Sequence, residues 1–265
     1  MYSHKDSSSQ ASIHSLRLQS LHLNWLVDFN SRIISGTAIY EAESSSSNGL
    51  QEIIFDQSGL KIHSIAINHE KVPFSTTDTT LLIHLSSRVV SGTSLNIAID
   101  YETSPEASAV QWLEPAATKG GKYPYVFTQS QAIHARSMFP SFDSPGVKVA
   151  YTASVTVPSW CTALMSALLS PWQSNDAKSS TDTRTFIFSQ PVPVPAYLVA
   201  LAAGDLASVD VSPRVKVWAE PAVVEKAAWE FGQTESFLAA AEELTCEYLW
   251  GRYDILCLPP SFPYG

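Results

Sequence analysis

Two amide side chains separated by one residue are the strongest candidates for chemistry in this sequence. Gln129 and Gln131 flank Ser130, and Ala132 follows them. In an extended segment, residues two apart point to the same face, so the two carboxamides are expected side by side. Their hydrogen-bond donors and acceptors could bind a peptide backbone or a free α-amine. From the pattern alone, a polar strip facing solvent is the commoner interpretation.

The seven histidines do not predict a catalytic zinc site. Zinc hydrolases commonly carry the pattern His-Glu-x-x-His on one helix, with the Glu as general base. His69 and Glu70 begin this pattern, but Pro73 stands where the second histidine belongs and would end a helix. The chain also lacks a G-x-S-x-G nucleophile motif and the glycine-rich phosphate-binding motifs. We therefore predict no catalytic residue and no metal ligand in this chain.

The residues after the glutamines are expected to be structural. Arg136 is interpreted as an ion-pair partner and not as a catalytic group. Asp143 lies between Ser141 and Pro145, where an Asp that bonds its own backbone in a turn is common. Aromatic and proline side chains around it predict a packed corner that holds the glutamine segment in place.

Several stretches together resemble the zinc aminopeptidases, the His-Glu-x-x-His metallopeptidases. The stretches that carry this resemblance are 129–136, 139–145, 193–198, 217–218, 250–254 and 258–265. The last of these reads Leu-Pro-Pro-Ser-Phe-Pro-Tyr-Gly and, by itself, is typical of a rigid turn after a strand. The likeness is strongest to the leukotriene A(4) hydrolase branch of the family, whose members also open an epoxide.

The resemblance implies roles that the residue pattern alone does not. In the family, the strand that carries the glutamines reaches into the substrate cleft, and its second polar residue helps to bind the substrate α-amine. Most members carry Glu where this chain has Gln131; a neutral amide attracts an ammonium less but tolerates a lipid substrate better. The residues implied to bind substrate are Gln129, Ser130, Gln131, Ala132, Tyr264 and Gly265, and the last two would begin a loop that pairs with an extended peptide.

The resemblance also implies zinc in the complete family protein. There the zinc polarises the scissile carbonyl and activates water, whereas the zinc ligands are absent from this sequence. We therefore expect the chain to be an N-terminal fragment that recognises peptide substrates, or an epoxide lipid, and is inactive alone. The alternative is a naturally short, non-catalytic module that binds peptides or other proteins.

Composition narrows the class of protein. Hydrophobic residues make up 45% of the chain, and the formal net charge is −9 with no basic block. An acidic globular chain of this kind predicts neither nucleic-acid nor membrane partners. The three cysteines, which show no C-x-x-C spacing, are expected to be reduced thiols. The polar N-terminus lacks the apolar core of a signal peptide, so a cytoplasmic protein is predicted.

The elements that must position these residues are predicted to be mainly β. Apolar residues at every second position predict strands over 21–29, 34–40, 60–67, 81–85, 95–101, 151–157, 185–188 and 197–201. A strand over 214–219, a helix over 224–244 and a strand over 253–258 follow. We predict a disordered leader over 1–12 and a curved antiparallel β domain over 13–207. The resemblance implies that residues 208–265 are the incomplete start of a thermolysin-like α/β catalytic domain.

Overall fold

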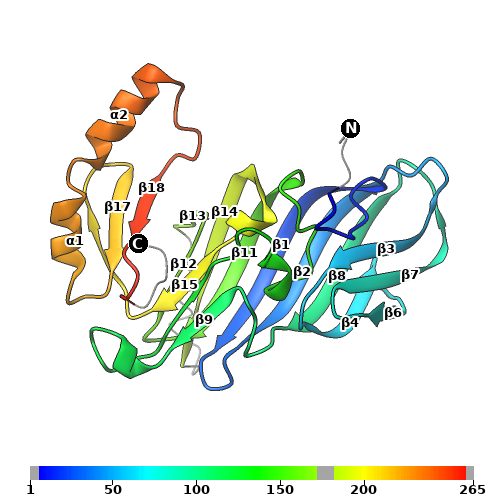
Figure 1. Cartoon of the computed structure of the whole chain (residues 1–265), viewed down its shortest axis with the longest axis horizontal. Coiled ribbons are helices and arrows are strands. Elements are labelled where there is room, and N and C mark those ends of the chain that lie inside the picture. The colour runs from blue at the N-terminus through cyan, green and yellow to red at the C-terminus, as the bar shows by residue number, and fades with distance from the viewer. Residues whose placement is uncertain (1–5, 172–181, 261–265) are drawn as a thin grey trace. The chain divides into compact units, whose positions relative to one another are not determined.

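The structure is a computed structural model that describes residues 6–171 and 182–260 (Figure 1). It divides into two compact units. Unit 1 comprises Met1–Gln111, Phe127–Pro158 and Leu164–Leu201, and unit 2 comprises Trp112–Val126, Ser159–Ala163 and Ala202–Gly265. The sequence predicted one boundary, between residues 207 and 208. By contacts along the backbone, unit 2 also includes two earlier segments, Trp112–Val126 and Ser159–Ala163.

Unit 1 contains an eight-stranded sheet in the order β13-β14-β11-β1-β2-β8-β4-β5. The strands are β1 (Leu16–Asp28), β2 (Ile33–Ser44), β4 (Lys61–Ile67), β5 (Glu70–Lys71), β8 (Ser94–Glu102), β11 (Lys148–Pro158), β13 (Leu168–Leu169) and β14 (Thr183–Pro195). All neighbouring pairs are antiparallel except β1 and β11, which run parallel with Leu21 beside Tyr151. The prediction of a mainly β fold is confirmed, but the parallel pair was not predicted.

A second, three-stranded sheet completes unit 1, in the order β3-β7-β6. Its strands are β3 (Leu50–Asp56), β6 (Phe74–Thr76) and β7 (Thr80–Val89). Tyr40 of β2 packs against Phe55 of β3 with ring centroids 5.0 Å apart, and Phe55 packs against Phe142 at the same distance. Trp25 donates its indole N–H to the Tyr101 hydroxyl at 2.7 Å. The apolar residues that alternate along the strands therefore meet in one aromatic core.

The N-terminal residues are tied to this unit. The sequence predicted a disordered leader over 1–12; residues 1–5 lie outside the described residues. The Ser12 N–H donates to the Ile54 carbonyl at 3.0 Å, and the Ile54 N–H donates to the Ser12 hydroxyl at 2.9 Å. Residues 6–12 therefore form an N-terminal segment that is hydrogen-bonded to β3, which differs from the prediction.

A further four-stranded sheet has the order β12-β15-β10-β9. Its strands are β9 (Val110–Leu113), β10 (Tyr125–Thr128), β12 (Thr162–Met165) and β15 (Leu201–Gly204). Short 3-10 helices connect the strands: η1 (Pro115–Ala117), η2 (Ala135–Ser137) and η3 (Ala196–Leu198). The predicted strand over 197–201 is therefore wrong for its first four residues: η3 ends at Leu198, two irregular residues follow, and β15 starts only at Leu201.

Unit 2 carries a three-stranded sheet, β16 (Ala207–Asp210), β17 (Val215–Ala219) and β18 (Tyr253–Leu256), with β17 in the centre. Strands β17 and β18 are parallel. Two helices, α1 (Val224–Glu230) and α2 (Thr234–Leu244), replace the single predicted helix. Gly232 lies between them and favours a break, because glycine is a poor helix former. The Thr234 hydroxyl donates a hydrogen bond to the Phe231 carbonyl at 2.7 Å across this break.

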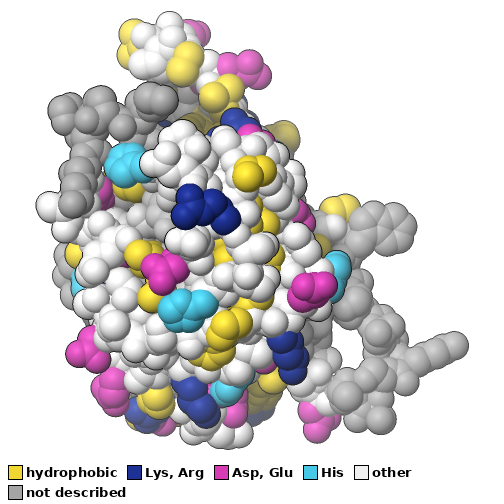
Figure 2. Space-filling model, turned by 90° about the vertical axis from the view of Figure 1, so that its right-hand side faces the viewer, with side chains coloured by type: hydrophobic (Ala, Val, Ile, Leu, Met, Phe, Trp, Pro, Cys, Tyr) yellow, Lys and Arg dark blue, Asp and Glu magenta, His cyan; other side chains and the backbone are white. Residues whose placement is uncertain are grey.

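Large apolar side chains and mixed charges both occur on the surface of the described residues. Several large apolar side chains of unit 2 are exposed, including Trp229 at 83%, Phe237 at 67% and Leu244 at 84%. On the face shown in Figure 2, basic, acidic and histidine side chains are interspersed among the described residues. Among the described residues, no helix has both the length and the apolar character needed to cross a membrane.

Candidate functional site

The glutamine segment, Gln129–Ala132, directly follows strand β10. The strand ends at Thr128, whose hydroxyl accepts a hydrogen bond from the Leu201 N–H at 2.8 Å. The Gln129 N–H donates to the Ala109 carbonyl at 2.9 Å. Backbone and side-chain hydrogen bonds therefore hold the start of the segment within unit 1.

The segment turns at its second glutamine. The His134 N–H donates to the Ser130 carbonyl at 2.8 Å, and residues 131–134 form a turn. The sequence predicted an extended segment in which Gln129 and Gln131 share one face. The structure differs because the strand ends before Gln129, so the two amides do not alternate along one strand. The peptide bond between Gln131 and Ala132 is cis.

The four side chains of the segment differ in exposure. Gln131 and Ala132 are exposed, and Gln129 is half-buried. Ser130 is only 3% exposed, and its hydroxyl has no hydrogen-bond partner among the described residues. A side chain this buried offers no surface to a substrate. The Gln131 carboxamide is therefore the polar group of the segment best placed to meet a ligand.

Serine side chains brace the turn from η2 and from the loop before β9. The Ser137 hydroxyl donates to the His134 carbonyl at 2.8 Å and accepts the Ala109 N–H at 2.9 Å. The Ser108 hydroxyl lies 2.8 Å from His134 Nδ1. These residues could not be identified from the sequence, because single serines and histidines in loops carry no recognisable spacing.

An ion pair holds the chain beyond the turn. Arg136 donates from Nε to Asp143 Oδ2 at 3.0 Å and from its backbone N–H to the same oxygen at 3.2 Å. Its Nη2 also donates to the Asp143 carbonyl at 3.2 Å. The side chains are 12% and 1% exposed, respectively. The interpretation of Arg136 as an ion-pair partner is confirmed.

Asp56, the last residue of β3, completes a buried polar cluster. Its Oδ2 accepts the Asp143 N–H at 3.1 Å and the Ser9 hydroxyl at 2.6 Å, and its Oδ1 accepts the Gln10 N–H at 2.9 Å. Arg136 Nη2 lies 3.8 Å from Asp56 Oδ2. Burial raises the pKa of the Asp143 carboxyl; hydrogen bonds from Arg136 oppose this rise, and the charge of Asp56 adds to it. Asp56 could not be identified as a member of this cluster from local patterns, because it lies 87 residues from Asp143.

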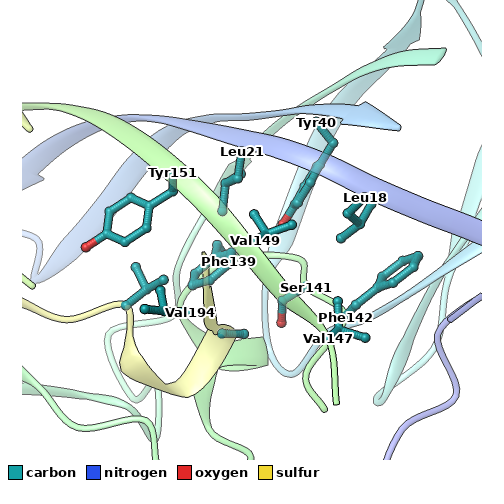
Figure 3. Close-up of a pocket in the computed structure, with 12 residues that line it drawn as sticks. Leu18, Leu21, Tyr40, Phe139, Ser141, Phe142, Val147, Val149, Tyr151 and Val194 are labelled. Carbon is teal, nitrogen blue, oxygen red and sulfur yellow. The ribbon is translucent and has the colours of Figure 1, made fainter. Parts of the chain in front are cut away.

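The corner between the ion-paired residues packs into the apolar core of unit 1. Phe139 and Phe142 line a small cavity together with Tyr40, whose hydroxyl donates to the Pro140 carbonyl (Figure 3). The cavity volume is about 20 Å³, which is room for about one water molecule. This cavity therefore supports the predicted packed corner and is too small for a substrate.

The remaining predicted site residues, Tyr264 and Gly265, lie outside the described residues. The described part of the chain contains no group of three or more His, Cys, Asp or Glu side chains placed to hold a metal ion. Catalytic zinc typically has three such protein ligands beside an open position. The described residues therefore do not fit a zinc site.

Comparison with known proteins identifies the family. Residues 11–198 match the family described as the Peptidase M1 N-terminal domain, which is most of the chain. The chain belongs to the M1 zinc aminopeptidase family. This result confirms the resemblance found in the sequence, and it assigns the matched residues to the N-terminal domain of M1 proteins.

Individual M1 relatives agree with this assignment. The chain is 40% identical to leukotriene A-4 hydrolase of Xenopus laevis over 98% of its own length and 43% of that protein. It is 36% identical to aminopeptidase B of Homo sapiens, covering 98% of this chain and 42% of that protein. Solved structures of yeast LTA4 hydrolase, native and in complex with bestatin, are 34% identical with a TM-score of 0.89 and cover 100% of this chain and 41% of theirs. The chain thus spans less than half the length of these M1 relatives.

Proposed function

We propose that this chain is the recognition portion of a zinc aminopeptidase of the leukotriene A4 hydrolase type. In this proposal the glutamine segment binds the N-terminus of a peptide substrate. The observation that carries it is the exposed Gln131 carboxamide, held on a turn that is braced from two sides, within a chain of the M1 family. The M1 relatives include proteins named as aminopeptidases, and one relative has been solved with bestatin bound.

The chemistry of the segment is recognition and not bond cleavage. A carboxamide oxygen accepts hydrogen bonds from an ammonium, and its NH2 group donates to a peptide carbonyl. Because Gln131 is neutral, it orients an α-amine through hydrogen bonds without the attraction of a full charge. In the complete family protein, zinc supplies the polarisation of the scissile carbonyl, and its ligands would come from residues other than those described here.

A neutral recognition group also suits a second class of substrate. An epoxide lipid carries no ammonium, so an acidic side chain at this position would stay desolvated and unpaired against it. An amide avoids that cost. We therefore extend the proposal to an epoxide lipid as an additional substrate, in line with the relatives named as leukotriene A4 hydrolases.

The test is kinetic and uses the complete gene product. Hydrolysis of an aminoacyl-p-nitroanilide would be measured with zinc and after chelation, for the wild type and for Gln131→Ala. We expect activity that depends on zinc, and a KM that rises about tenfold in Gln131→Ala with kcat nearly unchanged, because binding of the α-amine is lost. Gln19→Ala, an exposed glutamine on β1, is the matched control and should leave KM unchanged.

The outcomes separate the parts of the proposal. Wild-type protein without zinc-dependent peptidase activity would refute the enzyme assignment and favour a non-catalytic binding module. An active enzyme whose KM is the same in Gln131→Ala would refute the role of the glutamine segment alone. Epoxide hydrolysis would be assayed in parallel, and its absence would restrict the substrates to peptides.

A further inference from the structure

The buried cluster around Asp56 connects three parts of unit 1 that are far apart in the sequence. The N-terminal segment reaches it through Ser9 and Gln10, strand β3 through Asp56 itself, and the chain after the glutamine segment through Arg136 and Asp143. Asp56 is 0% exposed and Asp143 is 1% exposed. A cluster this buried holds its members in one geometry, because each lost hydrogen bond would leave a desolvated polar group.

The one cationic side chain among the described residues of the cluster does not balance the charges of both carboxylates. Two carboxylates face one guanidinium, so one negative charge lacks a cationic partner within the group. Neutral donors compensate: Asp56 accepts three hydrogen bonds, from Ser9, Gln10 and the Asp143 backbone. Two of these donors come from the N-terminal segment. The buried carboxylate therefore depends on that segment for its solvation.

The backbone around the cluster transmits this geometry to η2. The Asp56 N–H donates to the Ser141 carbonyl at 2.9 Å, and the Ser141 N–H donates back to the Asp56 carbonyl at 3.1 Å. The Ser58 N–H donates to the Arg136 carbonyl at 2.9 Å. Arg136 lies in the middle of η2, which directly follows the turn at residues 131–134. The end of β3 and the residues just after it thus hold η2 at Arg136 and the chain after η2 at Ser141.

We propose that Asp56, acting through Arg136 and Asp143, is a positioning residue for the glutamine segment, and that the N-terminal segment completes it by solvating Asp56. This inference rests on the function proposed above, since it concerns the same substrate-binding turn. Asp56 and Arg136 do not touch the substrate in this proposal. They set the position and rigidity of Gln131, and small displacements of a binding group reduce affinity strongly.

The test compares four variants of the complete gene product. Arg136→Met removes every side-chain hydrogen bond to Asp143, whereas Arg136→Lys keeps the charge but loses the planar fork that makes several bonds at once. Asp56→Asn replaces one acceptor oxygen by a donor that faces other donors. Ser9→Ala removes two hydrogen bonds at the half-buried edge of the cluster, the one donated to Asp56 and the one accepted from the Ala11 N–H. It keeps the test valid if the buried variants fail to fold.

Two readouts are needed. The first is hydrogen–deuterium exchange of residues 129–139, which requires no activity. We expect about tenfold faster exchange there in Arg136→Met and in Asp56→Asn, less in Arg136→Lys and least in Ser9→Ala. The second is KM against kcat for an aminoacyl substrate, where KM should rise in the same order while kcat changes less than about twofold. The control, Arg17→Met, removes an exposed ion pair to Glu43 and should change neither readout.

The contrary results are specific. Unchanged exchange over 129–139 in Arg136→Met and Ser9→Ala would overturn the positioning role. So would faster exchange that is spread evenly over unit 1, because that pattern indicates a general loss of stability. If the wild type shows no peptidase activity, the proposed function fails, and the exchange measurement still decides whether Asp56 positions the segment.

Discussion

Unit 1 and unit 2 differ in how they use their apolar side chains. Among the described residues, unit 2 exposes six large apolar side chains between residues 229 and 253, whereas unit 1 exposes five that are scattered over a much longer stretch. Unit 1 closes an aromatic core between two sheets. In unit 2, helix α2 has no buried residue. Its Glu235 and Glu242 form ion pairs with Arg214, the residue directly before strand β17.

This difference indicates which unit can support a precise site. A side chain in a closed core is fixed by many neighbours, and a loop anchored to that core inherits its rigidity. The glutamine segment is anchored in this way by Phe139, Phe142 and the polar cluster. Exposed apolar surface and half-exposed ion pairs hold a helix far less firmly.

The first prediction compares two phenylalanines. Phe55→Ala should lower the free energy of unfolding of unit 1 by about 4 kcal/mol, because Phe55 is 0% exposed and packs against two other rings. Phe237→Ala in unit 2 should change the free energy of unfolding by less than about 0.5 kcal/mol, because the ring is 67% exposed. Urea unfolding of both variants would measure this. Equal losses would contradict the contrast between the units.

The second prediction asks whether unit 2 has any tightly packed region. A Cβ atom added at Gly204 would lie 2.3 Å from a ring carbon of Tyr125, which is buried. Gly204→Ala should therefore destabilise unit 2 by about 2 kcal/mol, because the ring must move. Gly120→Ala is the control, since a Cβ there meets nothing within 4 Å. A thermal unfolding midpoint that is the same for both variants would show that the ring relocates freely.

The third prediction concerns the pH dependence of helix α2. Hydrogen bonds from Arg214 and from the Tyr248 N–H lower the pKa of Glu242 from 4.5 to about 2. An acid with a lowered pKa in the folded state stabilises the fold above its ordinary pKa, and this contribution is lost as the pH falls from 4.5 towards 2. The protection factor of residues 234–244, which is the intrinsic exchange rate at each pH divided by the observed rate, should therefore fall over that range.

Two variants test whether Glu242 causes this pH dependence. Glu242→Gln should exchange faster at neutral pH and show a weaker dependence between pH 4.5 and 2, because the titrating partner of Arg214 is gone. Glu243→Gln changes the neighbouring exposed carboxylate and should retain the wild-type dependence. If Glu242→Gln and the wild type gave the same curve, the ion pair would have no measurable effect on α2.

Local patterns predicted much of unit 1, and long-range contacts explain what they did not predict. The alternation of Leu21, Leu23 and Trp25 identified β1, because period two is a property of neighbouring residues. The ion pair of Arg136 was predicted from its setting. Its neighbour Asp56 was not, since a buried carboxylate at the end of a strand has no local signature. The same reason applies to Ser9 and Gln10, whose polar sequence is typical of a leader until the partner is known.

The prediction of the candidate site was partial for a similar reason. The amide pair at Gln129 and Gln131 was found from residue type and family likeness, but the turn that begins at Gln131 depends on the Ser130 carbonyl and on η2. The break between α1 and α2 could have been predicted from Gly232, which is a poor helix former. The kinetic test of Gln131→Ala addresses the proposal that the glutamine segment binds peptides.

The parallel pairing of β1 with β11 has a consequence for how the chain is made. His22 and Thr152, which face each other across this pair, are 130 residues apart. A ribosome adds about 5–20 residues per second, so β1 waits several seconds for its second neighbour to be synthesised. During that time one edge of β1 is open to other strands, and such edges are sites of aggregation. Synthesis rate and chaperone supply should therefore influence the yield of this protein more than that of a chain built only from hairpins.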